Sequence, residues 1–306
     1  AYVPERDLFI EKDAAINEEL EKLRLSATRC LLERRDTIVV ASVSCIYGLG
    51  DPANYLNLSV TLNAGGTRER AMLLRDLVAI QYARNQVAFE PGVFRVRGDV
   101  IEVYPAYEDV AYRIELWGDE IERLSKIDPL RGVVLEKLET LTIWPKTHYV
   151  TPEDKLEKAI RGIKAELEAR EEQFRAEGKI VELQRLHQRT VYDLEMMKEM
   201  GYCSGIENYS RFLDGRAPGE PPHTLLDYFP EDFVLFMDES HVATGQLHGM
   251  YNGDQSRKRT LVDFGFRLPA ALDNRPLKFE EFEARVKQVV FVSATPGDYE
   301  LQQSGG

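Results

Sequence analysis

The sequence predicts an α/β protein whose parallel sheet is interrupted by two inserted domains. Three apolar runs, residues 37–43, 233–237 and 289–292, do not alternate between apolar and polar side chains. Unbroken runs of β-branched and aromatic residues are typical of strands in a parallel sheet that is covered on both faces. We therefore assign residues 1–51 and 226–306 to one sheet-containing domain, which the insertions divide.

The first insertion, residues 52–150, is predicted to be a small α+β domain. Residues 93–124 alternate around two Gly-Asp pairs, at 98–99 and 118–119, as antiparallel hairpins do. A helical stretch over residues 73–82 precedes this ribbon.

The second insertion, residues 151–225, is predicted to be helical. Apolar residues recur at helical spacing on both sides of Gly178, which favours two helices separated by a break. The mixed charges between them are interpreted as solvated faces. Residues 216–222 form a Pro/Gly-rich connector.

Composition excludes several classes of protein. The 306 residues include 52 acidic and 39 basic side chains, a formal net charge of -13, so any DNA contact has to be local. No apolar run approaches the roughly 20 residues that cross a bilayer, so we predict a cytoplasmic protein without a membrane partner. Three isolated cysteines support neither a disulfide framework nor a zinc site. The histidines are scattered, and no partner is predicted for His148.

The end of the second apolar run carries the clearest candidate for catalysis. Asp238, Glu239, Ser240 and His241 follow it, and open α/β sheets place their chemistry at the carboxyl ends of strands. Asp238 could hold a magnesium ion through water, and Glu239 could polarise an attacking water, as phosphoanhydride hydrolysis requires. A surface turn rich in helix-capping groups would carry the same residues, so this motif alone leaves both interpretations open.

A second strand-end motif favours the enzymatic interpretation. Ser293-Ala294-Thr295 follows the third apolar run, and the hydroxyls of Ser293 and Thr295 can relay the state of a neighbouring phosphate. If the two strands are neighbours, the carboxylates and hydroxyls converge, and the motifs predict part of a nucleic-acid-stimulated ATPase. The phosphate-binding pattern G-x-x-x-x-G-K-[ST] does not occur in the sequence, so this chain by itself is not expected to bind ATP productively.

An excess of arginine is the second chemical signal. Residues 51–100 contain six arginines, no lysine and five acidic residues, a net charge of +1 in a chain of -13. Arg95 and Arg97 share one face of a predicted strand, as Arg113 and Glu115 do on a later one. Guanidinium groups on a rigid sheet suit bidentate capture of carboxylates or phosphates on a partner, although an ordinary soluble face is the alternative.

Two weaker signals point to nucleic acid. Tyr2 and Phe9 could stack on bases, and Asn208, Tyr209 and Arg211 could contact a nucleic-acid backbone. Ordinary packing explains both groups equally well.

Six short motifs occur in order along the chain. They are residues 41–50 (ASVSCIYGLG), 94–98 (FRVRG), 192–197 (YDLEMM), 205–211 (GIENYSR), 238–241 (DESH) and 293–297 (SATPG). This ordered set resembles the UvrB family, which verifies damage in bacterial nucleotide excision repair. The resemblance extends over essentially the whole chain.

The resemblance implies a partial RecA-like domain of helicase superfamily two. Residues 52–150 would be its UvrA-binding domain, 151–225 a helical insertion lining the DNA path, and 1–51 would include a remnant of a DNA-binding β-hairpin. It also implies UvrA and damaged double-stranded DNA as partners, UvrC bound through a region outside this chain, and ATP with Mg²⁺ as cofactors of the full-length protein. The chain alone would be an inactive part of a DNA-stimulated ATPase.

The resemblance also implies roles for single residues. Those matching the UvrA contacts are Arg84, Arg95, Arg97, Arg113 and Glu115, and those matching DNA contacts are Tyr2, Phe9, Ser42 and Ser44. Together with Asn208, Tyr209 and Arg211, inferred above from the residues alone, they make up the predicted DNA-binding set. One departure follows Val242, where the family has a threonine and a proline before the glutamine and this chain has Ala243-Thr244-Gly245. Gly245 frees the backbone there, which predicts looser positioning of this segment.

Two alternatives remain open from the sequence. One is a UvrA-docking, DNA-binding module without an ATPase role. The other is the UvrB-like part of a transcription-repair coupling factor, against which the intact Asp238-Glu239 pair argues.

Overall fold

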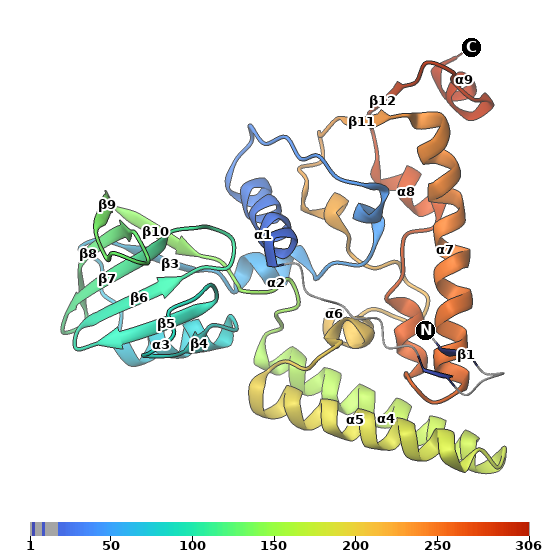
Figure 1. Cartoon of the computed structure of the whole chain (residues 1–306), viewed down its shortest axis with the longest axis horizontal. Coiled ribbons are helices and arrows are strands. Elements are labelled where there is room, and N and C mark those ends of the chain that lie inside the picture. The colour runs from blue at the N-terminus through green and yellow to red at the C-terminus, as the bar shows by residue number, and fades with distance from the viewer. Residues whose placement is uncertain (1, 4–7, 10–17, 306) are drawn as a thin grey trace. The chain divides into compact units, whose positions relative to one another are not determined.

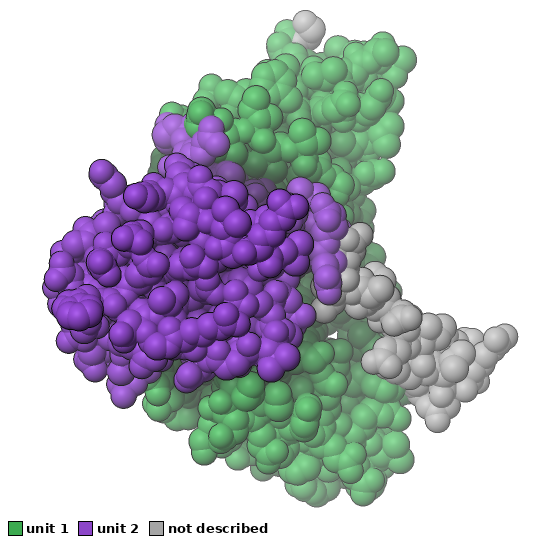
Figure 2. All heavy atoms as spheres, turned by 60° about the vertical axis from the view of Figure 1, so that its left-hand side comes forward, with its two compact units in different colours: residues 1–14, 36–50, 153–306 green, residues 15–35, 51–152 purple. Residues whose placement is uncertain are grey.

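The chain divides into two compact units, each a mixture of helices and strands. The computed structural model describes residues 2–3, 8–9 and 18–305. Unit 1 comprises residues 1–14, 36–50 and 153–306, and unit 2 comprises residues 15–35 and 51–152. Figure 2 shows the two units in different colours.

A six-stranded mixed sheet forms the body of unit 2 (Figure 1). Its strands, in spatial order, are β4 (Ala83–Arg84), β5 (Val93–Arg97), β6 (Val100–Tyr104), β7 (Ala111–Trp117), β8 (Glu120–Ile127) and β9 (Val134–Leu138). The β4–β5 pair is parallel and the other pairs are antiparallel, which confirms the ribbon predicted over residues 93–124. Gly98 and Gly118 turn the hairpins with φ of 60° and 62°, values that glycine adopts without strain.

The core of unit 2 lies between one face of this sheet and helix α3 (Arg70–Ala79), which confirms the predicted helix. Leu73 and Leu77 of α3 and Ile101 and Ile114 of the sheet are all 0% exposed. The unit also contains α1 (Glu18–Glu33), α2 (Pro52–Asn57) and the antiparallel pair β3 (Val60–Asn63) and β10 (Thr140–Ile143). With one sheet face used for the core, the other remains available for polar side chains.

Residues 153–200 of unit 1 form two long helices, as predicted. Helices α4 (Glu153–Ala176) and α5 (Ile180–Met200) lie side by side (Figure 1). Gly178 joins them with φ of 72°, which explains the break in the pattern. Two shorter helices, η3 (Ile206–Tyr209) and α6 (Ser210–Asp214), follow, and residues 216–222 form neither helix nor strand.

A two-stranded parallel sheet forms the rest of unit 1. Strand β11 (Leu235–Asp238) pairs with β12 (Val289–Val292), so two of the three predicted strands are confirmed. The helices around them are η4 (Leu225–Tyr228), α7 (Ser240–Asp263), η5 (Pro269–Asp273), α8 (Phe279–Arg285) and α9 (Asp298–Ser304). The predicted burial on both faces is wrong, because Phe236 is 68% and Val292 is 44% exposed in this two-stranded sheet.

The strand predicted over residues 37–43 is also wrong. Residues 37–42 form neither helix nor strand, and Val43–Ile46 form a 3-10 helix, η2. Ile38 and Val40 are 93% and 96% exposed. An apolar run becomes a strand only where a neighbour accepts its backbone hydrogen bonds, and none of the described strands pairs with this segment.

Two short strands, β1 (Tyr2–Val3) and β2 (Leu8–Phe9), pair in antiparallel register with Tyr2 opposite Phe9. The side chains of these two aromatics, predicted to stack on bases, lie outside the described residues. Within residues 18–305, no helix is long and apolar enough to cross a membrane.

His148 has partners in unit 2 that were not predicted. Its side chain is 2% exposed, its Nε2 lies 2.9 Å from the Thr28 hydroxyl, and its ring stacks on Tyr55 with centroids 5.5 Å apart. Burial, and to a smaller extent the charge of Arg24, lowers the pKa of His148 from its ordinary 6.5 to about 3. The folded protein therefore holds this imidazole neutral.

This burial predicts an acid sensitivity of unit 2. Between pH 6.5 and pH 3 the unfolded chain binds a proton at His148 that the folded chain does not, so the unfolding free energy falls as the pH falls, by about 1.4 kcal/mol at pH 5.5. Urea unfolding at pH 7.5 and 5.5, followed by tryptophan fluorescence, measures this, since Trp144 stacks on Tyr55. A His148→Phe control should lose that part of the pH dependence; an identical slope in both proteins would contradict the assignment.

Candidate functional site

The exits of β11 and β12 lie side by side in unit 1. The strands are parallel, and Asp238 is the register partner of Val292, so Glu239 and Ser293 both follow the same edge of the sheet. A direct contact joins the two motifs, because Nδ1 of His241 lies 2.7 Å from the Ser293 hydroxyl. The predicted convergence of these strand ends is confirmed.

Glu239 has an unusual backbone conformation at this edge. Its φ of 45° and ψ of 48° lie in the left-handed region, which costs a residue with a Cβ about 1–2 kcal/mol. The Glu239 backbone N–H donates to Asp238 Oδ1 at 3.1 Å, and the Glu239 side chain is 70% exposed. The turn therefore directs the Glu239 carboxylate outward, at the start of α7.

A buried carboxylate is hydrogen-bonded to the segments that follow both strands. Glu300 of α9 is 3% exposed and accepts hydrogen bonds from the Ser240 hydroxyl and from the Gly297 backbone N–H. Ser240, which is 0% exposed, directly follows Glu239, and Gly297 ends the Ser-Ala-Thr-Pro-Gly motif. The two motifs are thus linked through one side chain.

The polar groups at this edge fit a hydrated magnesium ion. Mg²⁺ usually keeps several waters and binds one or two carboxylates together with substrate phosphates, and Asp238 offers an exposed carboxylate of that kind. No cluster of three or more metal-ligating side chains occurs in the part of the chain that the structure describes. With no phosphate-binding loop in the sequence, no step of ATP hydrolysis follows from these residues alone.

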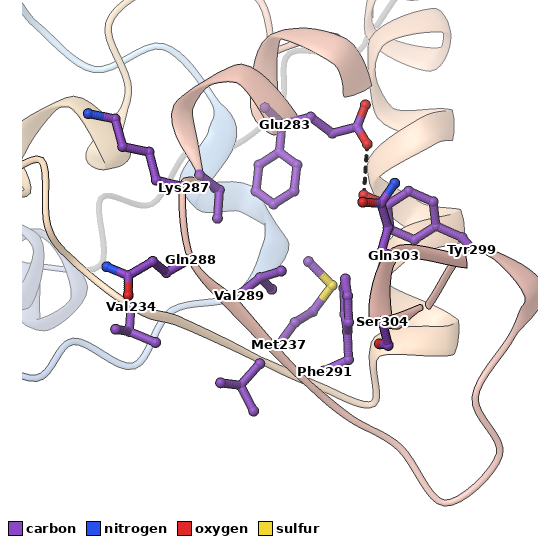
Figure 3. A pocket seen from close by; sticks show the side chains of 13 residues that line it. Val234, Met237, Glu283, Lys287, Gln288, Val289, Phe291, Tyr299, Gln303 and Ser304 are labelled. Atoms are coloured by element: carbon purple, nitrogen blue, oxygen red, sulfur yellow. Dashed lines mark hydrogen bonds between the residues drawn. The ribbon is translucent and has the colours of Figure 1, made fainter. Parts of the chain in front are cut away.

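A pocket of about 760 Å³ opens beside the same sheet (Figure 3). Side chains from β11, β12, α8 and α9 line it, and the Tyr299 hydroxyl donates to Glu283 at 2.8 Å across one side. Asp238, Glu239 and Ser293 are not among its lining residues. The candidate catalytic groups therefore lie on the open edge of the sheet and not in this pocket.

The second candidate site is the outer face of the sheet in unit 2. Cross-strand register places Arg95 opposite Glu102 and Glu102 opposite Arg113. Glu102 accepts from Nε of Arg95 at 2.5 Å and from Nε of Arg113 at 2.8 Å. Burial alone would raise the pKa of Glu102, but the hydrogen bonds from the two arginines lower it below its ordinary value.

Four of the five residues predicted to contact UvrA meet on this face. Arg95, Arg97, Arg113 and Glu115 line a shallow depression of about 250 Å³, together with Val100 and Glu102. Arg84 is not among them, because it lies on the edge strand β4, opposite Phe94 in register. The alternation of side chains along each strand therefore predicted which residues share this face. Arg84 lies apart from them, on the edge strand β4.

The residues predicted to contact DNA do not form one cluster. Ser42 and Ser44 are exposed, Ser42 directly before η2 and Ser44 within it. Tyr209 is buried and donates to Asp193 at 2.7 Å, and Arg211 is buried between Glu166 and Asp273, at 2.7 Å and 2.8 Å. The polar groups of Tyr209 and Arg211 thus already have protein partners. Asn208 donates to the Gly205 carbonyl at 2.8 Å.

Two protein-family models match parts of this chain. Residues 60–149 match the UvrB interaction domain and residues 154–215 match the UvrB third helical domain. The chain is 63% identical over 305 residues to UvrABC system protein B of Caldanaerobacter subterraneus subsp. tengcongensis. It is 59% identical to the proteins of that name from Caldicellulosiruptor bescii and Chloroflexus aggregans. Each alignment covers 99% of this chain.

The chain belongs to the UvrB family. It spans 46% of the length of each of these relatives, about half. The interaction-domain match lies within unit 2 and includes the arginine face, whereas the third-domain match covers α4 to α6 in unit 1. Both candidate sites thus lie in a UvrB-family chain whose sequence similarity extends from end to end.

Glu102 and Glu300 of this UvrB-family chain were not predicted as functional residues from the sequence. A signal for Glu102 was present, because a hairpin that turns at Gly98-Asp99 pairs residue 95 with residue 102. No sequence signal identifies Glu300, whose partners lie on other elements. Gly245 lies within α7, so the predicted looseness concerns a helix and not a loop, and it stays a prediction.

The left-handed conformation of Glu239 predicts a stabilising substitution in this UvrB-family chain. Glu239→Gly removes the Cβ that clashes there and should raise the free energy of opening of the α7 amino terminus by about 1 kcal/mol. Hydrogen exchange of the first α7 amides measures this. Asp238→Gly is the matched control, because Asp238 has no positive φ and its replacement should not stabilise the helix. Equal exchange rates in Glu239→Gly and the unsubstituted chain would show that no strain is stored there.

Proposed function

We propose that this chain is the part of a nucleotide excision repair protein that binds UvrA and contributes the acidic pair of an ATPase site. The observation that carries this proposal is the similarity to UvrABC system protein B along 99% of the chain, at 63% identity. The chain would act in the cytoplasm on damaged double-stranded DNA, and UvrC would contact a region outside it. Unit 1 would then be part of a RecA-like domain of helicase superfamily two.

The parallel pairing of β11 with β12 supports the ATPase role. Asp238 would hold a hydrated Mg²⁺ ion and Glu239 would polarise the attacking water, while the hydroxyls of Ser293 and Thr295 would face the phosphates. ATP bound with Mg²⁺ would supply the phosphoanhydride. The loop that binds the phosphates of ATP would be contributed by residues outside this sequence. The contact of His241 with Ser293, at 2.7 Å, is a route by which the two motifs can act together.

The ATPase role predicts a specific loss of activity. In a protein that joins this chain to the phosphate-binding loop of a UvrB-family relative, Glu239→Gln should lower DNA-stimulated ATP hydrolysis about 10²–10⁴-fold, because the general base is lost. Phosphate release measures this. Glu231→Gln, which neutralises a carboxylate with a 91% exposed side chain, is the control and should keep the activity. If Glu239→Gln and the unsubstituted protein hydrolyse ATP equally poorly, the chain is a docking module without an ATPase role.

The arginine face supports UvrA docking. Three guanidinium groups and Glu115 surround one shallow depression on a rigid sheet, within the residues that match the UvrB interaction domain. Arg97 is exposed, and among the described residues its guanidinium makes no hydrogen bond or ion pair. Such a group can pair with a partner carboxylate without first breaking an internal bond. We propose Arg95, Arg97, Arg113 and Glu115 as the docking residues, with Arg84 at the edge of the surface.

Charge reversal tests this docking face. Arg95→Glu with Arg97→Glu should weaken UvrA binding by about 2–5 kcal/mol, because charged pairs at the interface become repulsive. Titration calorimetry at low ionic strength measures this. Lys158→Glu with Arg161→Glu makes the same charge change at exposed positions of α4 and should leave the affinity unchanged. If both double variants bind UvrA with equal affinity, the arginine face does not dock UvrA and serves only as a solvated surface.

The UvrB-like part of a transcription-repair coupling factor is less well supported. The relatives compared above all carry the name UvrABC system protein B. Asp238 and Glu239 are also both present at the strand exit, as an active ATPase site needs.

A further inference from the structure

Glu102 occupies the centre of the arginine face and is nearly inaccessible. Its side chain is 7% exposed, although it lies on the outer side of the sheet, because the Arg95 and Arg113 side chains cover it from the two neighbouring strands. Each carboxylate oxygen serves one arginine, Oε2 for Arg95 and Oε1 for Arg113. A single carboxylate therefore fixes the spacing of two guanidinium groups.

Each of the two arginines is also held at a second point. The Arg95 guanidinium lies over the Phe89 ring, 4.1 Å from its centroid, and Arg113 donates from Nη2 to the Gly132 carbonyl at 3.1 Å. Two anchors on a planar group leave it little rotational freedom. The face is thus organised before any partner arrives, which lowers the entropy that binding would otherwise cost.

Stability alone does not explain a buried carboxylate at this position. Replacing a buried ion pair with apolar side chains is often neutral or stabilising, and the core of unit 2 lies on the opposite face of the sheet. A function that does require the carboxylate is to orient two guanidinium groups that would repel each other without it.

The charge around Glu102 indicates the chemistry of the partner. Beside the ion-paired triad of Arg95, Glu102 and Arg113, the Arg97 guanidinium has no hydrogen-bond or ion-pair partner among the described residues, and Glu115 already pairs with Arg123 at 3.0 Å. The face keeps an excess of positive charge in a chain of net -13. Its rigid, forked donors fit carboxylates at fixed positions on a folded acidic protein surface.

We propose that Glu102 is a positioning residue for docking, which holds Arg95 and Arg113 in the orientation that receives an acidic surface of the partner protein. The inference rests on the proposed docking of UvrA to this face. The inference predicts that removing the negative charge of Glu102 lowers the affinity for an acidic partner. Charge alone would predict the opposite, because the substitution makes the face more positive.

The experiment compares UvrA binding of the whole chain with that of Glu102→Gln and Glu120→Gln. Glu120 is exposed and lies on β8 opposite Trp117. Among the described residues no hydrogen bond or ion pair joins it to Arg95, Arg97 or Arg113, so its substitution adds the same charge without removing a bond to these arginines. We expect Glu102→Gln to lower the affinity about 30-fold or more, mainly through faster dissociation. Glu120→Gln should bind equally well or slightly more tightly. If Glu102→Gln behaves as Glu120→Gln does, Glu102 has no positioning role.

Three further measurements keep the outcomes distinct. Glu102→Leu replaces the carboxylate with an apolar side chain that a sheet accepts, so it keeps the test valid if Glu102→Gln fails to fold; binding as tight as that of the unsubstituted chain would overturn the inference. Arg97→Glu tests the docking face itself. If Arg97→Glu leaves UvrA binding unchanged, the proposed docking fails, whereas loss with Arg97→Glu but not with either Glu102 variant rejects only the positioning role. The third measurement is binding of the same variants to duplex DNA. If they lose affinity for duplex DNA but keep their affinity for UvrA, the partner of this face is not an acidic protein surface and the inference is overturned.

Discussion

The parallel pairing of β11 with β12 is the constraint on which the candidate catalytic site depends. Asp238 and Val292 are register partners, so the residues after each strand emerge at one edge, where His241 reaches Ser293 at 2.7 Å. A shift of one residue in this register would send the Asp238 side chain to the other face of the sheet. The left-handed residue Glu239 is followed directly by Ser240, which is buried and hydrogen-bonded to Glu300.

At both candidate sites a buried carboxylate supports functional groups that are more accessible than it is. Glu300 holds the backbones that carry Glu239 and the Ser-Ala-Thr motif, and Glu102 holds the guanidinium groups of Arg95 and Arg113. In both places the supporting residue is less exposed than the groups it serves. Binding and catalysis need such support, since a group displaced by about an ångström loses much of its effect.

Whether an element was predicted correctly from the sequence depends on how far apart along the chain its stabilising contacts lie. The helices on both sides of Gly178 and the hairpins at Gly98 and Gly118 depend on local periodicity and turn chemistry, and all were predicted. The strand predicted over residues 37–43 and the burial of Phe236 depend on a neighbour in space, and both predictions were wrong. An apolar composition is compatible with a strand but does not supply its hydrogen-bonding partner.

The sequence by itself determined which residues can do chemistry: the acidic pair and hydroxyls at two strand ends, the arginines that share a strand face, and the ordered motifs of the UvrB family. Only the tertiary structure decided which of them meet. It joined Arg95 and Arg113 through Glu102, left Arg84 at an edge, and turned Tyr209 and Arg211 toward internal carboxylates. The reason is that parity and motif order are properties of neighbours along the chain, whereas ion pairing and burial depend on register and packing between segments far apart in sequence.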